Sequence, residues 1–476
     1  MLFTSIEFLL FFFPAVFSIY YLLPNRFKNY WLLITSLFFY GWGEPLFVFV
    51  MIGSILINHR FALEIENLRD HPEKQKSILV LAVSVNLCIL AIFKYLNFVT
   101  VTLHSVFPQT ESLFPTTSIV LPIGISFFTF QSLSYVIDVY RGIPAQKSLF
   151  SVGLYISLFP QLIAGPIVRY TTIMDQISDR SINLKKTSDG LIRFFEGFNK
   201  KMILANTLSS VADQAFLGSE ISVGMAWLGA LCYSLQIYFD FSGYSDMAIG
   251  LGKMLGFEFL ENFNYPYISK TVTEFWRRWH ISLGTWFRDY VYFPMGGSRV
   301  KSRWQLVWNL LVVWTLTGIW HGANWTFILW GTLYGIVIII EKLLDIPKRL
   351  DHINRPLQCL YQALTLFLVM SGWVVFRSNN LTHAISYLKT MIGTNGSAIY
   401  DLDFVFFLRE YVIYIIFGCL CSTPVFRNLR RRMAYVSPAL ETITYSTHYI
   451  FQLILFVISF SFLIMNAHNP FIYFNF

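Results

Sequence analysis

The sequence predicts an all-α polytopic membrane protein. Residues of the types AVILMFWYC make up 55% of the 476 residues, only 13% are charged, and the mean hydropathy is +0.55. Soluble proteins contain more charge, since charged residues make up about 25% of average usage. The apolar residues also form long runs, and a helix crosses the hydrocarbon core with roughly 20 residues. We therefore expect a single membrane domain over residues 1–476 rather than two or three soluble domains.

The apolar runs predict about eleven or twelve transmembrane helices. The first run has no basic residues before it and no cleavage site after it, which favours a retained helix over a signal peptide. The second run is interrupted by Gly41-Trp42-Gly43-Glu44-Pro45, which favours two helices joined as a hairpin. The runs cover residues 8–23, 30–57, 78–103, 119–139, 150–166, 225–251, 304–320, 324–340, 357–376, 404–421 and 446–465.

Basic residues cluster between the runs and predict the orientation of the chain. Cytoplasmic loops of membrane proteins are enriched in lysine and arginine. The loops with Arg26, Lys74, Lys348 and the basic cluster 427–432 are therefore expected in the cytoplasm, and residues 104–118, without Lys or Arg, outside. The last run then places the C-terminus outside. The net charge of +8 follows from this pattern and does not indicate nucleic acid as a partner.

Residues 189–216 are amphipathic and mix charged residues with phenylalanines. Such a segment is typical of a helix that lies in the membrane interface. Placing it on the cytoplasmic side requires the short run 150–166 to be re-entrant.

Residues 271–290 form a second amphipathic stretch. Thr271-Val272-Thr273-Glu274 is a capping box, which predicts that a helix begins there. Apolar residues and one histidine then recur at three- and four-residue intervals on one face, which predicts that this helix continues: Trp276, His280, Leu283 and Phe287. It is too charged to span a bilayer, so we expect a tilted or re-entrant helix buried against protein. An interfacial helix anchored by tryptophans and arginines is the alternative.

His321 is the residue most strongly expected to carry chemistry. It lies within Gly318-Ile319-Trp320-His321-Gly322-Ala323-Asn324-Trp325, where two apolar runs meet. An ionisable residue at membrane depth costs free energy and is a functional candidate by default, whereas the alternative is a histidine bonded to a helix carbonyl. A neutral imidazole can accept a proton from an alcohol and return it to a leaving group. Tertiary folding would have to bring His280 to it.

Two carboxylates, Asp240 and Asp246, share one apolar run. Each must be paired, protonated or hydrated. One interpretation is that both carboxylates line a cavity, and the other is that Asp246 lies near the cytoplasmic end of the helix. The sequence leaves both interpretations open. The five cysteines lie in or beside apolar runs without metal or redox spacing, and no phosphate loop or Gly-x-Ser-x-Gly elbow is present. We expect no bound metal or cofactor.

Six motifs in the central part of the chain, with the ending Asn469-Pro470-Phe471-Ile472-Tyr473-Phe474, resemble a known family. They are residues 122–127, 160–167, 238–246, 274–280, 286–290 and 318–325. The chain resembles the membrane-bound O-acyltransferases (MBOAT), specifically the bacterial alginate O-acetyltransferase branch, which is similar to peptidoglycan O-acetyltransferases. The family core would cover about residues 120–340.

The resemblance implies that His321 is the catalytic histidine and that His280 is the second family position, occupied by Asn or Asp in other branches. It implies a central tunnel and a cytoplasmic acyl thioester, acetyl-CoA, as donor. Tyr473 matches a C-terminal Phe/Tyr motif proposed to carry the acyl group in related systems; its alternative is a tyrosine that anchors the interface. Candidates for lining the tunnel or the substrate are Trp276, Arg277, Arg278, Asp289, Asn324, Asp240 and Asp246.

The resemblance also implies a cellular setting. We expect a multi-pass protein of the bacterial cytoplasmic (inner) membrane, in contact with membrane lipid, with an extracytoplasmic C-terminus. A periplasmic or surface polysaccharide acetyltransferase resembling SGNH hydrolases would be its partner. The expected function is moving an acetyl group across the membrane for O-acetylation of an extracytoplasmic, alginate-like polysaccharide. Peptidoglycan O-acetylation and teichoic-acid D-alanylation are alternatives, as are a polymer or small-molecule transporter and a scaffold outside the enzyme class.

Overall fold

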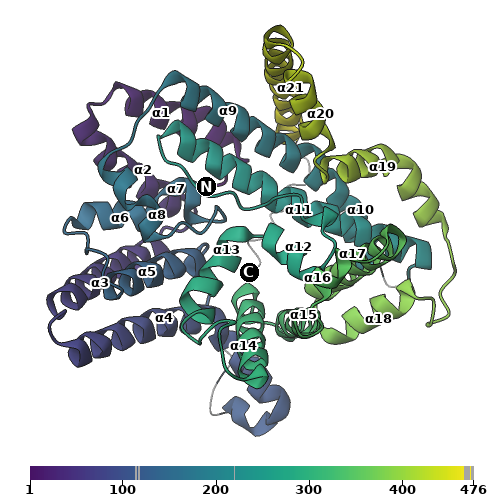
Figure 1. Cartoon of the computed structure of the whole chain (residues 1–476), viewed down its shortest axis with the longest axis horizontal. Coiled ribbons are helices and arrows are strands. Elements are labelled where there is room, and N and C mark those ends of the chain that lie inside the picture. Colours follow the sequence, from purple (N-terminus) through teal and green to yellow (C-terminus); the bar gives the residue numbers. More distant parts are fainter. Residues whose placement is uncertain (113–114, 116–117, 219, 466–471, 473–476) are drawn as a thin grey trace. The chain divides into compact units, whose positions relative to one another are not determined.

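The computed structural model describes residues 1–112, 115, 118–218, 220–465 and 472, and every regular element in these ranges is helical (Figure 1). The all-α prediction is confirmed. Contacts divide the chain into two compact units, one of Met1–Leu191 with Met247–Leu260 and one of Ile192–Asp246 with Glu261–Phe476. The single membrane domain over residues 1–476 stays a prediction.

Six helices among the described residues are long and apolar enough to cross a membrane, and a shorter apolar segment covers Phe8–Leu22. The protein is therefore a multi-pass membrane protein. The six are α3 (Phe47–Asn67), α4 (Pro72–Val106), α15 (Trp325–Leu343), α17 (Arg355–Arg377), α19 (Leu402–Cys421) and α21 (Pro438–Ile464). In α19 and in α21, only 11% of the residues in the most apolar part of the helix are buried inside the protein. Such extensive exposed apolar surface marks a membrane interaction.

The first unit begins with η1 (Phe8–Phe12) and α1 (Phe13–Leu22) and continues with α2 (Asn25–Gly43), η2 (Pro108–Ser112), α5 (Ile125–Tyr140), α6 (Leu149–Ser157), α7 (Phe159–Leu162) and α8 (Tyr170–Ser178). The predicted break after residue 41 is confirmed, because α2 ends at Gly43 and α3 begins at Phe47. Residues 150–166 are divided between α6 and α7. Gly124, at φ +77°, begins α5 where a Cβ would lie 2.9 Å from the carbonyl oxygen of Leu162. Only glycine fits there without strain.

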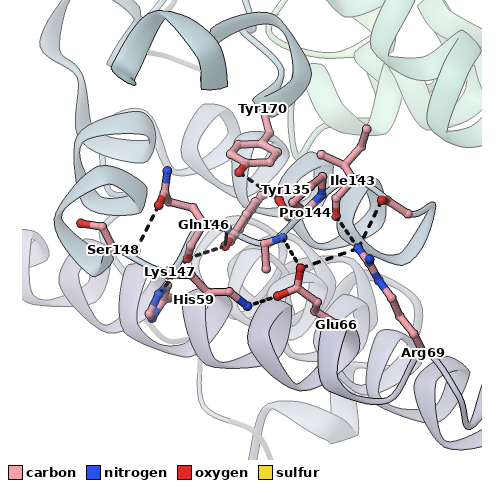
Figure 2. A network of polar contacts seen from close by, with 12 residues as sticks. His59, Glu66, Arg69, Tyr135, Ile143, Pro144, Gln146, Lys147, Ser148 and Tyr170 are labelled. Atoms are coloured by element: carbon pink, nitrogen blue, oxygen red, sulfur yellow. Dashed lines mark hydrogen bonds and ion pairs between the residues drawn. The ribbon is translucent and has the colours of Figure 1, made fainter. Parts of the chain in front are cut away.

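The loop between α5 and α6 is fixed to α3 by polar contacts (Figure 2). Glu66 accepts a hydrogen bond from the backbone amide of Ala145 at 3.1 Å and pairs with Lys147. Arg69 donates to the carbonyl oxygens of Gly142 and Ile143. These contacts satisfy backbone groups that would otherwise have no partner in a turn of this kind.

The second unit contains the remaining helices. They are η3 (Lys200–Ala205), α10 (Asn206–Leu217), η4 (Pro266–Ile268), α12 (Val272–Arg278), α13 (Ile281–Phe287), η5 (Arg288–Tyr292), α14 (Arg303–His321), α15, α16 (Ile346–Leu350), α17, α18 (Leu381–Met391), α19, α20 (Val425–Ala434) and α21, together with parts of α9 (Leu184–Asn199) and α11 (Val223–Met254). The helical run from α9 through η3 to α10 confirms the helix expected over residues 189–216. Its interfacial position stays a prediction.

The hairpin of α14 and α15 is held together by glycines. A Cβ on Gly318 would lie 2.4 Å from the carbonyl oxygen of Phe327, and one on Gly331 would lie 2.5 Å from that of Trp314. Real Cβ atoms do not approach backbone this closely. The absence of side chains at Gly318 and Gly331 therefore lets the backbones of α14 and α15 approach closely.

Candidate active site

His321 is the last residue of α14 and is 2% exposed. Its ring lies 5.0 Å from the ring of Trp320, 5.0 Å from Trp330 of α15 and 5.4 Å from Phe376 of α17, measured between centroids. Gly322 follows directly, and a Cβ there would come within 2.3 Å of the Phe327 ring. The packing of three helices thus fixes the imidazole in an aromatic environment.

His280 lies between α12 and α13, so the expectation of one helix over residues 271–290 is wrong. Its φ of +43° places it in the left-handed region, which ends a helix. The helix ends here because a neighbouring segment, residues 262–264, takes up its backbone hydrogen bonds. The amide of Asn264 donates to the carbonyl of Arg278 at 2.9 Å, and the amide of Ile281 donates to the carbonyl of Asn262 at 2.9 Å. The backbone groups that would continue the helix therefore bond elsewhere.

The predicted start of this helix is confirmed. Thr271 accepts a hydrogen bond at Oγ1 from the amide of Glu274 at 3.0 Å, and Glu274 Oε2 accepts from the amide of Lys270 at 2.9 Å. Both satisfy backbone donors at the N-terminus of α12.

A buried polar cluster surrounds His280, which is 2% exposed. Nδ1 of His280 lies 3.1 Å from Oδ1 of Asn262, and the same oxygen accepts from the hydroxyl of Ser282 at 2.9 Å. Burial lowers the pKa of His280 to about 3. The imidazole is therefore neutral near neutral pH, as proton transfer with an alcohol requires.

The rings of both histidines lie close to the indole of Trp320. The ring centroid of Trp320 lies 5.9 Å from that of His280 and 5.0 Å from that of His321. Trp276 packs against Trp330 at 5.3 Å and so joins the same aromatic cluster. The structure therefore brings together three of the sequence-predicted site residues.

The other candidates of this region make local contacts. Arg278 pairs with Glu274 on the same helix, and Asp289 pairs with its neighbour Arg288. Asn324 caps α15 by accepting from the amide of Thr326 at 3.1 Å, and its Nδ2 donates to the carbonyl of Asn379. Arg277 is exposed on α12. Their role in lining a tunnel stays a prediction.

Asp240 and Asp246 are both paired, one of the alternatives that the sequence left open. Lys201 lies 2.5 Å from Asp240, and each side chain is 2% exposed. Asp246 contacts Lys200 at 2.5 Å and Arg193 at 2.6 Å. Asp240 Oδ2 also accepts from the amide of Ile472 at 3.0 Å. Tyr473 lies outside the described residues.

Sequence reasoning missed Asn262, Lys201 and Glu341. Glu341 is 1% exposed and accepts hydrogen bonds from the first amides of α12. Glu341 directly follows an apolar run and Lys201 lies in the amphipathic stretch 189–216, whereas no sequence pattern marks Asn262. Their partners lie on other helices, so no local spacing could have identified them.

The chain matches a known protein family and several of its members. The membrane-bound O-acyltransferase (MBOAT) family matches residues 85–382. The chain is similar to a probable alginate O-acetylase AlgI of Azotobacter vinelandii, at 42% identity over 88% of this chain and 85% of that protein. Its identity to the AlgI of Pseudomonas putida is 40% over 100% of both chains. A peptidoglycan O-acetyltransferase of Helicobacter pylori is 32% identical over 100% of this chain and 98% of its own length.

The chain belongs to the membrane-bound O-acyltransferase family. It is a multi-pass membrane enzyme that transfers acyl groups to oxygen. The resemblance inferred from the six motifs is confirmed.

Proposed function

We propose that this protein moves an acetyl group from a cytoplasmic thioester across the membrane for O-acetylation of an extracytoplasmic polysaccharide of the alginate type. The observation that carries the proposal is the pair of buried histidines, His321 and His280, whose ring centroids lie 5.0 Å and 5.9 Å from that of Trp320. Relatives named as probable alginate O-acetylases are 40–45% identical over most of the chain, and they support an alginate-type polysaccharide as the final acceptor of the acetyl group.

In the proposed reaction, His321 accepts the proton of an acceptor hydroxyl as its oxygen attacks the thioester carbonyl carbon. A carbon–oxygen bond forms, the carbon–sulfur bond breaks, and the sulfur leaves as a thiol with the proton that His321 received. His280 positions the acceptor or polarises the donor carbonyl. The aromatic rings around both histidines exclude water, which would otherwise hydrolyse the thioester.

Acetyl-CoA is the proposed donor. The acetyl group would pass through a tunnel, and Tyr473 would carry it on the outer side to a periplasmic or surface transferase resembling SGNH hydrolases. This direction of transfer requires the cytoplasmic membrane of a bacterium and an extracytoplasmic C-terminus. The uneven distribution of Lys and Arg between the loops supports that orientation.

The donor half of the reaction can be tested on purified protein in lipid nanodiscs with acetyl-CoA. Release of free CoA thiol should occur with the native chain and stop with His321→Ala. Mass spectrometry of the native protein should reveal an acetylated Tyr473, and Tyr473→Phe should prevent that adduct. A transporter without acyl chemistry would release no thiol and would continue to translocate its substrate in His321→Ala.

Peptidoglycan O-acetylation is the second candidate function. The peptidoglycan O-acetyltransferase of Helicobacter pylori matches this chain along its whole length and favours it. Acetyl esters on isolated muropeptides that depend on His321, with an unacetylated exopolysaccharide, would establish this alternative.

A further inference from the structure

Asn262 is a fully buried amide whose orientation is fixed by its partners. Its Oδ1 accepts from the backbone amide of Ser282 at 3.2 Å and from the hydroxyl of the same residue at 2.9 Å. Its Nδ2 donates to the hydroxyl of Ser245 at 3.0 Å. A backbone N–H can only donate, so the side-chain atom that faces Ser282 has to be the oxygen.

The orientation of this amide determines the tautomer of His280. Oδ1 of Asn262 lies 3.1 Å from Nδ1 of His280 and can only accept. The proton between these atoms therefore belongs to Nδ1. A neutral imidazole carries a single N–H, so Nε2 of His280 has a lone pair and no proton.

We propose that Asn262 is a positioning residue that holds His280 as the Nδ1–H tautomer, so that Nε2 presents a lone pair and can accept, but not donate, a hydrogen bond during acyl transfer. The inference rests on the proposed acyl transfer and narrows the role of His280 within it. A thioester carbonyl oxygen requires a donor, and Nε2 in this tautomer has no proton to donate. Polarisation of the donor carbonyl is thereby assigned to another group.

Other neighbours of His280 agree with this state. The hydroxyl of Ser282 lies 3.4 Å from Nδ1, but it donates its proton to Asn262. The ring of Phe241 meets the imidazole edge-on at 4.6 Å, and the ring centroid of Trp320 lies 5.9 Å away. Neither ring carries a charge that would favour the imidazolium. The low pKa of His280, caused by burial, agrees with a neutral imidazole.

The tautomer can be measured directly by ¹⁵N solid-state NMR. The full-length protein is labelled with ¹⁵N-histidine, reconstituted in lipid, and His280 is assigned by difference from His280→Asn. At neutral pH we expect a protonated Nδ1 and an unprotonated Nε2. A protonated Nε2 in the native protein would overturn the proposal, whatever the result of the acyl-transfer assays.

Two variants of Asn262 test whether this residue fixes the tautomer of His280. Asn262→Leu removes the acceptor, so we expect both tautomers and a decrease in acetyl transfer of roughly tenfold, the effect of losing one positioned hydrogen bond. Asn262→Asp keeps an acceptor oxygen and should retain the Nδ1–H tautomer. If Asn262→Leu does not fold, Asn262→Asp decides: an imidazole protonated at Nε2 alone in this variant contradicts the proposal, because the aspartate oxygen can only accept from a protonated Nδ1. An unchanged tautomer in a folded Asn262→Leu contradicts it as well.

Loss of activity in His321→Ala does not depend on the tautomer of His280. Normal acetyl transfer in His321→Ala, together with the expected tautomer, would refute the proposed function and leave the geometry of Asn262 established. The two failures are therefore distinguishable.

Discussion

Glu341 of α15 accepts a hydrogen bond at Oε1 from the backbone amide of Val272, 2.8 Å away, at the N-terminus of α12. Its second oxygen accepts from the amide of Thr273 at 2.7 Å. A carboxylate at this end satisfies two free N–H groups and interacts favourably with the helix dipole. The buried side chain thereby links α15, which follows His321, to the segment that leads to His280.

Replacing Glu341 with alanine should destabilise the protein by about 2–4 kcal/mol, because two amides would lose their charged acceptor. Glu341→Gln retains one acceptor oxygen and should cost less. Thermal unfolding in detergent measures both. Glu410→Ala, at an exposed position of α19, is the control and should leave the unfolding temperature unchanged. Equal stability of Glu341→Ala and the native chain would show that the cap contributes nothing.

The buried pair of Lys201 and Asp240 predicts a non-additive effect of mutation. Asp240→Asn or Lys201→Met alone leaves one charge buried without its counter-charge, which costs about 3–5 kcal/mol. The double variant removes both charges and should be more stable than either single variant. Unfolding by denaturant provides the comparison. The exposed pair of Arg60 and Glu64 is the control, and Glu64→Ala should change stability by less than about 1 kcal/mol. Additive losses in the double variant would contradict the coupling.

Gly331 should not tolerate a side chain. A Cβ there would lie 2.5 Å from the carbonyl oxygen of Trp314 and 2.8 Å from Cα of Gly318, so α14 and α15 would have to separate. We expect Gly331→Ala to cost about 1–3 kcal/mol and to reduce acetyl transfer, because His321 lies at the end of α14.

Gly53→Ala is the matched control for Gly331→Ala. Gly53 lies in α3, where a Cβ would meet nothing within 4 Å. Alanine has the higher helix propensity, so this variant should be neutral or more stable by up to about 1 kcal/mol. If Gly53→Ala is destabilised and Gly331→Ala is as stable as the native chain, the close backbone contact at Gly331 does not make its substitution costly.

Acid should destabilise the protein partly through His280. Its pKa rises from about 3 in the folded state to the ordinary 6.5 on unfolding. Between these values the unfolded chain binds the additional proton, so stability is complete above pH 6.5 and is lost as the pH falls toward 3. At pH 5 the loss from this group is about 2 kcal/mol. His280→Asn should show that much less acid sensitivity, whereas exposed His352→Ala should behave as the native chain. Identical pH dependence in His280→Asn would place the pKa of His280 near 6.5.

The sequence and the structure agree where the cause is local. The capping box at Thr271 began a helix as predicted, and the break within residues 30–57 followed from its glycines and proline. The end of α12 at Arg278 could not be predicted in this way. It depends on bonds to residues 262–264, which reach His280 only after folding.

The same distinction applies to the site. The burial of His321, and the need for Asp240 to be paired, protonated or hydrated, followed from the cost of polar groups among apolar residues. The identity of Lys201 as partner did not, because it lies on another helix of the chain. Asn262 likewise acquires its role through three-dimensional proximity to His280 and Ser245.

The proposed role of His321 is to carry out acyl transfer. The most direct test is the acetyl-ester content of extracellular polysaccharide from cells in which the chain is replaced by His321→Ala, with His352→Ala as the matched histidine control. Equal amounts of folded protein in the membrane fraction have to be verified for both. We predict that acetylation is lost in His321→Ala and retained in His352→Ala. Normal acetylation with His321→Ala would contradict the claim.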